Sequence, residues 1–166
     1  SKNRRILLSL ALMYESRNDR TQSETFLLKA LDTYPENPLV QTLAGEYYLR
    51  RGQLKDAEFH ASTALALHPA YPRGLDAMSR IYLAMKEYEK CLSVIDQIMQ
   101  VRSQDPDALY MRAQALVKLD RIPEAVKALE ATLLQDPSDE IARLVLEDLL
   151  MSNFPINDVQ RDRAAK

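Results

Sequence analysis

Residues 38–71 read PLVQTLAGEYYLRRGQLKDAEFHASTALALHPAY, and the pattern of this stretch returns along the chain with a period of about 34 residues. Four columns of the repeat keep their character. They hold a small residue (Ala11, Gly45, Ser79, Ala113), a large one (Tyr14, Tyr48, Tyr82, Leu116), a second small one (Ser23, Ala57, Cys91, Ala125), and a proline (Pro35, Pro69, Pro137) that Ser103 replaces once. A fixed period of this length is typical of a stack of like supersecondary units. It favours an extended binding surface over a catalytic pocket.

The composition fits long helices joined by short turns, because the 166 residues include only three glycines and 46% of them are hydrophobic. The formal net charge is −2, whereas nucleic-acid-binding proteins are usually basic, so no nucleic-acid partner is expected. No apolar run reaches the roughly 20 residues of a membrane helix, so this stretch is not expected to insert into a membrane. The chain starts with Ser1, not Met, and we expect it to be a fragment.

Turn signals divide each unit into two helices. Asn37-Pro38 and Asp105-Pro106 each combine an N-cap residue with proline at the first helical position. A second break falls inside each unit, at positions 18, 52, 86 and 120. First helices are therefore predicted at 4–17, 38–51, 72–85, 106–119 and 139–152, and second helices at 21–34, 54–68, 88–102 and 122–135.

The small columns have a packing reason. Two helices can cross closely only where a residue without bulk faces the partner helix, and Gly45 and Ala57 would allow that approach while Tyr48 fills the space beside it. Cys91 stands in the same column as Ala57, so it is expected to be buried and unreactive. The tyrosines of the large column are expected to be interior.

These columns resemble those of the tetratricopeptide repeat family, whose period is about 34 residues. The second unit carries the resemblance best, in Leu43-Ala44-Gly45-Glu46-Tyr47-Tyr48 followed by Gly52, Ala57, Ala64 and Pro69, and the fourth repeats it in Leu109 to Ala113. The chain departs from the family where a tryptophan is usual, with Leu7, Gln41, Leu75 and Leu109. The second-helix aromatic is replaced by Leu27, Ala61, Ile95 and Leu129.

The resemblance implies an all-α fold, a right-handed superhelical solenoid of antiparallel helix pairs with about four and a half repeats. We expect a single array over residues 1–166. Its predicted parts are repeats at 4–37, 38–71, 72–105 and 106–139, a C-terminal capping helix at 140–154 and a polar tail at 155–166.

The resemblance also implies that the first helices line a concave groove for a peptide or a partner helix. The side chains expected to bind the partner are Leu8, Leu12, Thr42, Glu46, Leu49, Arg73, Asp76, Arg80, Leu83, Tyr110, Met111, Gln114 and Lys118. Arg73 and Arg80 lie two helical turns apart and could together hold a carboxylate. The favoured alternative is that Asp76, one turn from each, pairs with them on the helix surface. Tyr110 is the tyrosine expected to be exposed for binding.

One branch of the family clamps the acidic C-terminus of heat-shock chaperones with lysines, asparagines and an arginine. The corresponding columns here hold Leu8, Leu12, Arg73, Ala77 and Met111, of which only Arg73 has the right charge. A chaperone-tail clamp is therefore not expected.

Other chemistry finds little support in the residues. His60 and His68 are eight residues apart on one predicted helix, too far to share a metal without a third ligand, and His68 is expected at a helix C-terminus. No serine, cysteine or carboxylate falls in a recognised catalytic motif, and there is no glycine-rich phosphate loop. We expect no enzyme activity, no metal and no cofactor.

The first helix is apolar nearly all round, from Ile6 to Tyr14. A terminal helix of a repeat array normally shows a polar outer face. We therefore expect that something covers it, either an upstream repeat or a second copy of the chain.

The function expected from these observations is a non-catalytic scaffold that binds a protein or peptide partner. One alternative is a self-assembling array that gives an oligomer its architecture. Another is a docking or regulatory domain of a larger enzyme or of an envelope-assembly protein. A cytoplasmic location is favoured, with a periplasmic or membrane-tethered parent protein as the alternative.

Overall fold

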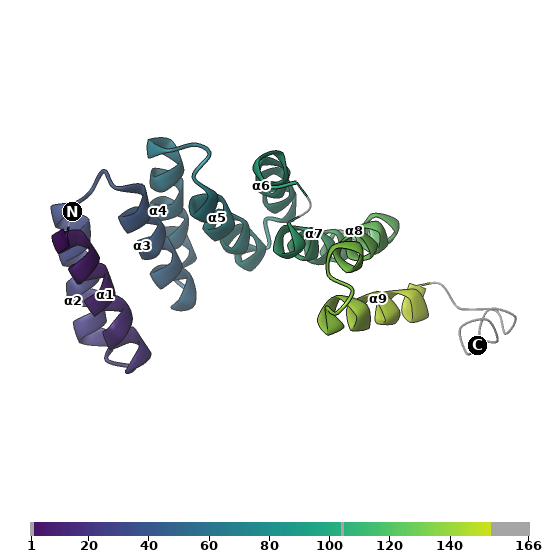
Figure 1. Ribbon diagram of the computed structural model, residues 1–166, viewed down its shortest axis with the longest axis horizontal. Coiled ribbons are helices and arrows are strands. Elements are labelled where there is room, and N and C mark those ends of the chain that lie inside the picture. The colour runs from purple at the N-terminus through teal and green to yellow at the C-terminus, as the bar shows by residue number, and fades with distance from the viewer. Residues whose placement is uncertain (1, 104, 154–166) are drawn as a thin grey trace, which may run out of the picture. The chain divides into compact units, whose positions relative to one another are not determined.

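The computed structural model describes residues 2–103 and 105–153, and within these ranges the chain folds as helices joined by short turns (Figure 1). The helices are α1 (Lys2–Ser16), α2 (Arg20–Thr33), α3 (Pro38–Arg50), α4 (Leu54–Leu67), α5 (Pro72–Met85), α6 (Tyr88–Val101), α7 (Pro106–Lys118), α8 (Ile122–Gln135) and α9 (Glu140–Asn153). Each begins and ends within two residues of its predicted position. The fold is an all-α helical repeat solenoid, as predicted. The polar tail expected at 155–166 lies outside the described residues.

The predicted helix starts are confirmed by their capping bonds. The side chain of Asn37 accepts a hydrogen bond from the Val40 amide at 3.2 Å, and Asp105 accepts one from Ala108 at 3.1 Å. In both helices proline follows at the first position, where its missing N–H leaves no bond unmade. Asp139 caps α9 in the same way, through the amide of Ala142.

The break inside each repeat is a left-handed residue. Asn18, Gly52, Lys86 and Asp120 have φ angles of 59°, 73°, 63° and 59°, and they occupy the same position of successive repeats. A residue in this conformation ends the first helix and turns the chain back so that the second helix can pack beside the first. Asparagine, glycine and aspartate tolerate this region. Lys86 adopts the same conformation, although lysine tolerates a positive φ less well than these three residue types.

The chain divides into two compact units, which are described separately. Unit 1 holds α1 to α5, with α1 against α2, α3 against α4, and α5 against both helices of the preceding pair. Its core has two clusters of buried side chains that join the helix pairs. They are Leu8, Ala30, Val40 and Leu43 in one, and Ala11, Leu27, Ala44 and Tyr47 in the other.

Helices α3 and α4 approach each other closely at Gly45. A Cβ atom built on this glycine would stand 3.1 Å from the carbonyl oxygen of Ala57 and 3.3 Å from the amide nitrogen of Ala61, both on α4. Ala57 and Ala61 are fully buried. The small columns therefore set the distance between α3 and α4, as predicted.

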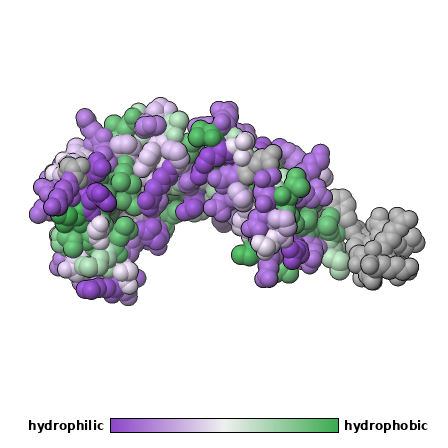
Figure 2. Space-filling model, viewed as in Figure 1, coloured by the Kyte–Doolittle hydropathy of each residue, from purple (hydrophilic) through white to green (hydrophobic). Residues whose placement is uncertain are grey.

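Unit 2 holds α6 to α9, each packed against the next along the chain. Its core contains Ile95, Ile98, Ala113, Leu116 and Leu129, all at most 2% exposed. Across both units, no helix in the described residues is long and apolar enough to cross a membrane. Apolar residues nevertheless remain on the surface of each unit, among polar ones (Figure 2).

The tyrosines of the large column are half-buried, not interior as predicted. Tyr14 stacks on Phe26 with ring centroids 5.4 Å apart, and Tyr48 stacks on His60 at 5.3 Å. In each case a ring of the second helix covers one face of the tyrosine and leaves other atoms accessible. The fully interior tyrosine of the second repeat is its neighbour Tyr47, which is 3% exposed.

Candidate partner-binding surface

The first helices of unit 1 present one continuous set of side chains. Residues three or four apart lie on the same side of a helix, so Leu12 and Glu15 share a side of α1, as Arg73 and Arg80 do on α5. We define the first-helix face as the accessible residues on these sides, namely Leu12, Glu15, Glu46, Leu49, Arg50, Arg73, Asp76, Arg80 and Leu83.

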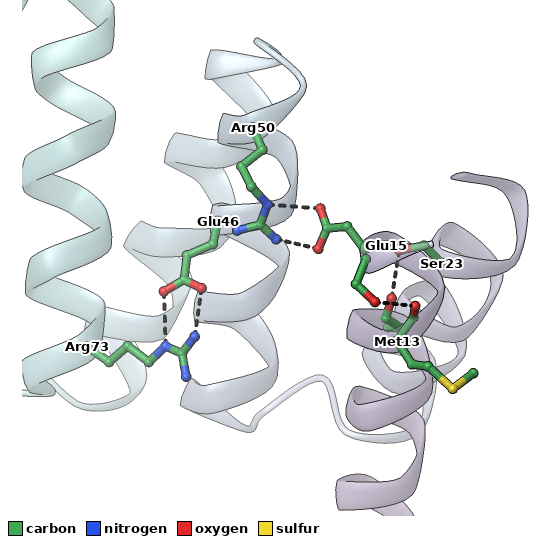
Figure 3. A network of polar contacts seen from close by, with 8 residues as sticks. Met13, Glu15, Ser23, Glu46, Arg50 and Arg73 are labelled. Atoms are coloured by element: carbon green, nitrogen blue, oxygen red, sulfur yellow. Dashed lines mark hydrogen bonds and ion pairs between the residues drawn. The ribbon is translucent and has the colours of Figure 1, made fainter. Parts of the chain in front are cut away.

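Two bidentate ion pairs join the helices across this face (Figure 3). Arg50 of α3 donates from Nε and Nη2 to the two carboxylate oxygens of Glu15 on α1, at 2.9 and 2.7 Å. Arg73 of α5 donates in the same way to Glu46 on α3, at 3.0 and 2.8 Å. Fork-to-fork pairs of this kind fix orientation as well as charge. They tie α1, α3 and α5 into one surface.

The pair with Glu46 decides the role of Arg73. Its hydrogen bonds to Glu46 raise the pKa of Arg73 above its ordinary value, and the charge of Asp76 acts in the same direction. The partner that holds the guanidinium is thus a carboxylate of the preceding repeat, where the sequence had suggested Asp76. Arg73 and Arg80 do not form a ready carboxylate site, because one of the two is already occupied.

Arg80 is the third arginine of this face and is not part of either ion pair. It is exposed, and its guanidinium makes no hydrogen bond or ion pair with the residues that the structure describes. It occupies the same repeat position as Leu12 and Glu46. Leu83, one turn further along α5, and Leu49 on α3 are half-buried. The face therefore combines an unpaired positive charge with partly accessible leucines.

Three of the predicted binding residues are in the core. Leu8 packs with Ala30 and Val40, Thr42 is fully buried, and Met111 is 8% exposed. A side chain without accessible surface cannot touch a partner, so these three are core residues of their own units and are not part of a binding surface. Of the remaining predicted residues in unit 1, all belong to the first-helix face.

The predicted residues of unit 2 lie along one side of α7. Tyr110, Gln114 and Lys118 follow each other at four-residue steps. Tyr110 and Gln114 are half-buried and Lys118 is exposed. Tyr110, the tyrosine expected to be exposed for binding, is thus only partly accessible.

A second surface feature, in unit 2, was not predicted from the sequence. A cavity of about 450 Å³ lies among α6, α7 and α8. Arg112 there donates to Asp96 at 2.9 Å, and Arg121 makes two hydrogen bonds to Glu124 at 2.7 and 2.6 Å. The sequence signal was a broken apolar column, since Arg112 stands where other repeats have Leu10, Ala44 and Met78. Both guanidinium groups are neutralised within the cavity.

The remaining reactive groups have structural partners. His60 shares a 2.8 Å hydrogen bond between its Nδ1 and Oε1 of Gln41, and burial lowers the pKa of its imidazole despite the nearby charge of Asp56. Burial raises the pKa of the Cys91 thiol to about 11, so it is protonated at neutral pH, and Cys91 is buried as predicted. The described residues contain no cluster of histidine, cysteine and carboxylate groups that could hold a metal.

Comparisons with known proteins agree with the repeat pattern. The model of the Tetratricopeptide repeat family matches residues 78–149. The TPR repeat-containing protein YpiA of Bacillus subtilis (strain 168) is 24% identical over 110 residues, which are 63% of this chain. The chain spans 26% of the length of that relative.

Solved structures share the fold at low sequence identity. The MamA structure from Desulfovibrio magneticus RS-1 (41-end) superposes with a TM-score of 0.81 at 14% identity, over 92% of this chain and 86% of that one. The first TPR of Spaghetti (RPAP3), bound to the HSP90 peptide SRMEEVD, superposes with a TM-score of 0.66 at 20% identity. That match covers 70% of this chain and 92% of the other.

Proposed function

We propose that the chain, which resembles the tetratricopeptide repeat family in its repeat pattern and matches its model over residues 78–149, is a non-catalytic scaffold that binds a partner peptide or partner helix along its first helices. The observation that carries this proposal is the first-helix face of unit 1. Two bidentate ion pairs fix its helices, and one exposed cation, Arg80, remains without a partner in the described structure. The ion-paired side chains are already ordered, so a ligand that binds this surface has few further side chains to immobilise besides Arg80.

The chemistry of the face suggests the chemistry of the partner. Glu15 and Glu46 are each held by an arginine, so their charges are already compensated. Arg80 can accept a carboxylate in bidentate geometry, and Leu12, Leu49 and Leu83 can receive apolar side chains. The proposed ligand is therefore a segment with one acidic residue and apolar anchors, bound in an extended or helical form.

A tail with several carboxylates fits this face poorly. The RPAP3 domain in the comparison binds the peptide SRMEEVD, but this chain has apolar residues in the columns of the chaperone-tail clamp. Leu8, Ala77 and Met111 are buried there, and Arg73 is engaged by Glu46. We expect no measurable binding of SRMEEVD in a calorimetric titration. Binding that Arg73→Glu abolishes would show that a clamp forms after all.

A capture experiment tests the proposed face. The full chain is immobilised and proteins retained from the source cell are quantified for the wild type, for Arg80→Glu and for Lys55→Glu. Lys55 is an exposed cation on α4, outside the face, so its variant makes the same charge change elsewhere. Circular dichroism confirms that each variant is folded.

The proposal predicts that Arg80→Glu loses at least tenfold of the principal partner, which corresponds to about 1.4 kcal/mol. Lys55→Glu is expected to retain that partner at the wild-type level. Equal recovery by the wild type and Arg80→Glu would reject the assignment of the face. Testing Leu83→Ala in the same experiment separates the apolar contribution to partner binding from the contribution of the Arg80 charge.

A further inference from the structure

The outer side of α1 is an open apolar face with basic flanks. Ile6 is 47% exposed, and Leu10 and Met13 lie at four- and seven-residue steps from it along the helix. Together with polar neighbours they line a shallow groove of about 820 Å³, whose residues are Lys2, Arg5, Ile6, Ser9, Leu10 and Met13. Figure 2 shows apolar surface over this part of unit 1. This groove does not include the first-helix face.

Among the residues that the structure describes, one side of α9 is a second exposed apolar face. Ile141, Leu144 and Met151 follow the helical period and are 63%, 64% and 58% exposed. The opposite side of the same helix carries Ala142 and Leu149, which are buried in unit 2. A helix that is apolar on two sides exposes one apolar stripe in addition to the stripe that is buried in its own unit.

The two faces carry opposite charges. Helix α1 has three cations, Lys2, Arg4 and Arg5, against the single carboxylate of Glu15, for a net charge of +2. Helix α9 has three carboxylates, Glu140, Glu147 and Asp148, against the single cation of Arg143, for a net charge of −2. Lys2 and Arg5 line the α1 groove, and the three carboxylates of α9 are exposed next to its apolar stripe.

From these two faces we propose that the chain associates with a second copy of itself head to tail, with α1 of one copy docked on α9 of the next. Apolar stripes of this kind bury each other in a helix-to-helix contact, and the flanking charges fix which faces meet. Two α1 faces repel each other, as do two α9 faces, so a symmetric dimer through either face is disfavoured. A heterologous contact repeats from copy to copy and builds chains or rings.

The contact uses none of the residues of the first-helix face of unit 1, although Ile141, Leu144 and Met151 stand two repeat periods after Arg73, Asp76 and Leu83 of that face. The charged flanks of the contact are solvent-exposed, so association weakens as salt rises from about 0.05 to 0.5 M. Apolar burial alone would not show this dependence.

Sedimentation velocity on the full chain, from a few micromolar to several hundred micromolar, tests the proposal. The wild type is expected to exceed the monomer mass of 19.0 kDa as concentration rises. One variant combines Lys2→Glu with Arg5→Glu, and a second combines Glu147→Lys with Asp148→Lys. Each is expected to remain a monomer by itself, while the control Lys55→Glu associates like the wild type.

Mixing the two double variants is the decisive step. The reversed α1 of the first complements the reversed α9 of the second, and the unaltered faces of the two copies complement each other. The equimolar mixture is therefore expected to recover the wild-type mass distribution. Recovery also shows that neither variant is misfolded.

Three results would overturn the proposal. A wild type that stays at 19.0 kDa over the whole range means that a different protein or segment covers these faces. Association of the α1 variant by itself means that copies meet without the α1 face. A mixture that remains monomeric means that the two faces do not meet each other.

Discussion

Replacing Gly45 with alanine separates two forces that act in opposite directions. Inside a helix, alanine is favoured over glycine by about 0.5–1 kcal/mol because it loses less backbone entropy on folding. At Gly45, however, the added Cβ meets the backbone of α4 at 3.1 Å from Ala57 and 3.3 Å from Ala61. Carbon contacts are most favourable at about 3.5–4.0 Å, so α3 and α4 must separate by a few tenths of an ångström.

Overpacking of a well-filled site costs about 1–3 kcal/mol, which exceeds the gain in helix propensity. Gly45→Ala is therefore expected to destabilise the protein by about 1 kcal/mol, or about 2–4 °C in Tm for a chain of this size. Gly74→Ala is the matched control. There the new Cβ meets side-chain atoms, Leu65 Cδ2 at 3.0 Å and Tyr71 Cδ1 at 3.2 Å, and side chains can move aside at lower cost than a helix backbone.

Urea denaturation followed by circular dichroism measures both variants against the wild type. We predict a lower midpoint for Gly45→Ala and a midpoint for Gly74→Ala that is nearer to, or above, that of the wild type. A higher midpoint for Gly45→Ala would refute this prediction, since helix propensity would then outweigh the close approach of α3 and α4.

Three further predictions concern a turn, a titration and a thiol. Lys86→Gly should stabilise the protein and Gly52→Ala should destabilise it, each by about 1 kcal/mol in thermal denaturation, because both positions have positive φ. The lowered pKa of His60 means that the unfolded chain binds the proton first, so stability should fall as pH drops below about 6.5. Denaturation midpoints of His60→Gln should show less of this loss than those of the wild type. With its pKa at about 11, Cys91 should react with a thiol reagent at pH 8 only after urea unfolding, and rapid reaction of the native protein would contradict its burial.

The helices and their turns could be predicted because each depends on residues close together in the sequence. Asn37 caps α3 through an amide three residues away, and Gly52 turns the chain between adjacent helices. Because the unit repeats, the column that contains Gly52 also located the helix breaks at Asn18, Lys86 and Asp120.

The ion pairs of the first-helix face could not be predicted in this way. Glu15 and Arg50 are 35 residues apart, and Glu46 and Arg73 are 27 apart. Whether such side chains meet depends on the offset between successive helices and on their rotamers, which no local pattern encodes. From the sequence alone, Arg73 was therefore paired within its own helix.

Which residues of one repeat column are buried could not be predicted from the sequence either. Leu8, Thr42, Asp76 and Tyr110 occupy the same column, but the first two are buried and the others are half-buried. What covers each one depends on the neighbouring helix pair. Met111 was predicted to bind a partner, although two of the other three residues of its column, Leu43 and Ala77, are apolar and buried and only Ser9 is exposed.

The central claim is that a partner binds the first-helix face, and site-specific photo-crosslinking tests it most directly. A photoreactive benzoylphenylalanine is placed at Leu83, on this face, or at Phe59, which is 64% exposed on α4 outside it. The partner retained in the capture experiment is then irradiated with each variant, and the products are identified by mass spectrometry. We predict crosslinks to that partner from position 83 and none from position 59. Crosslinks from position 59 with none from position 83 would contradict the claim.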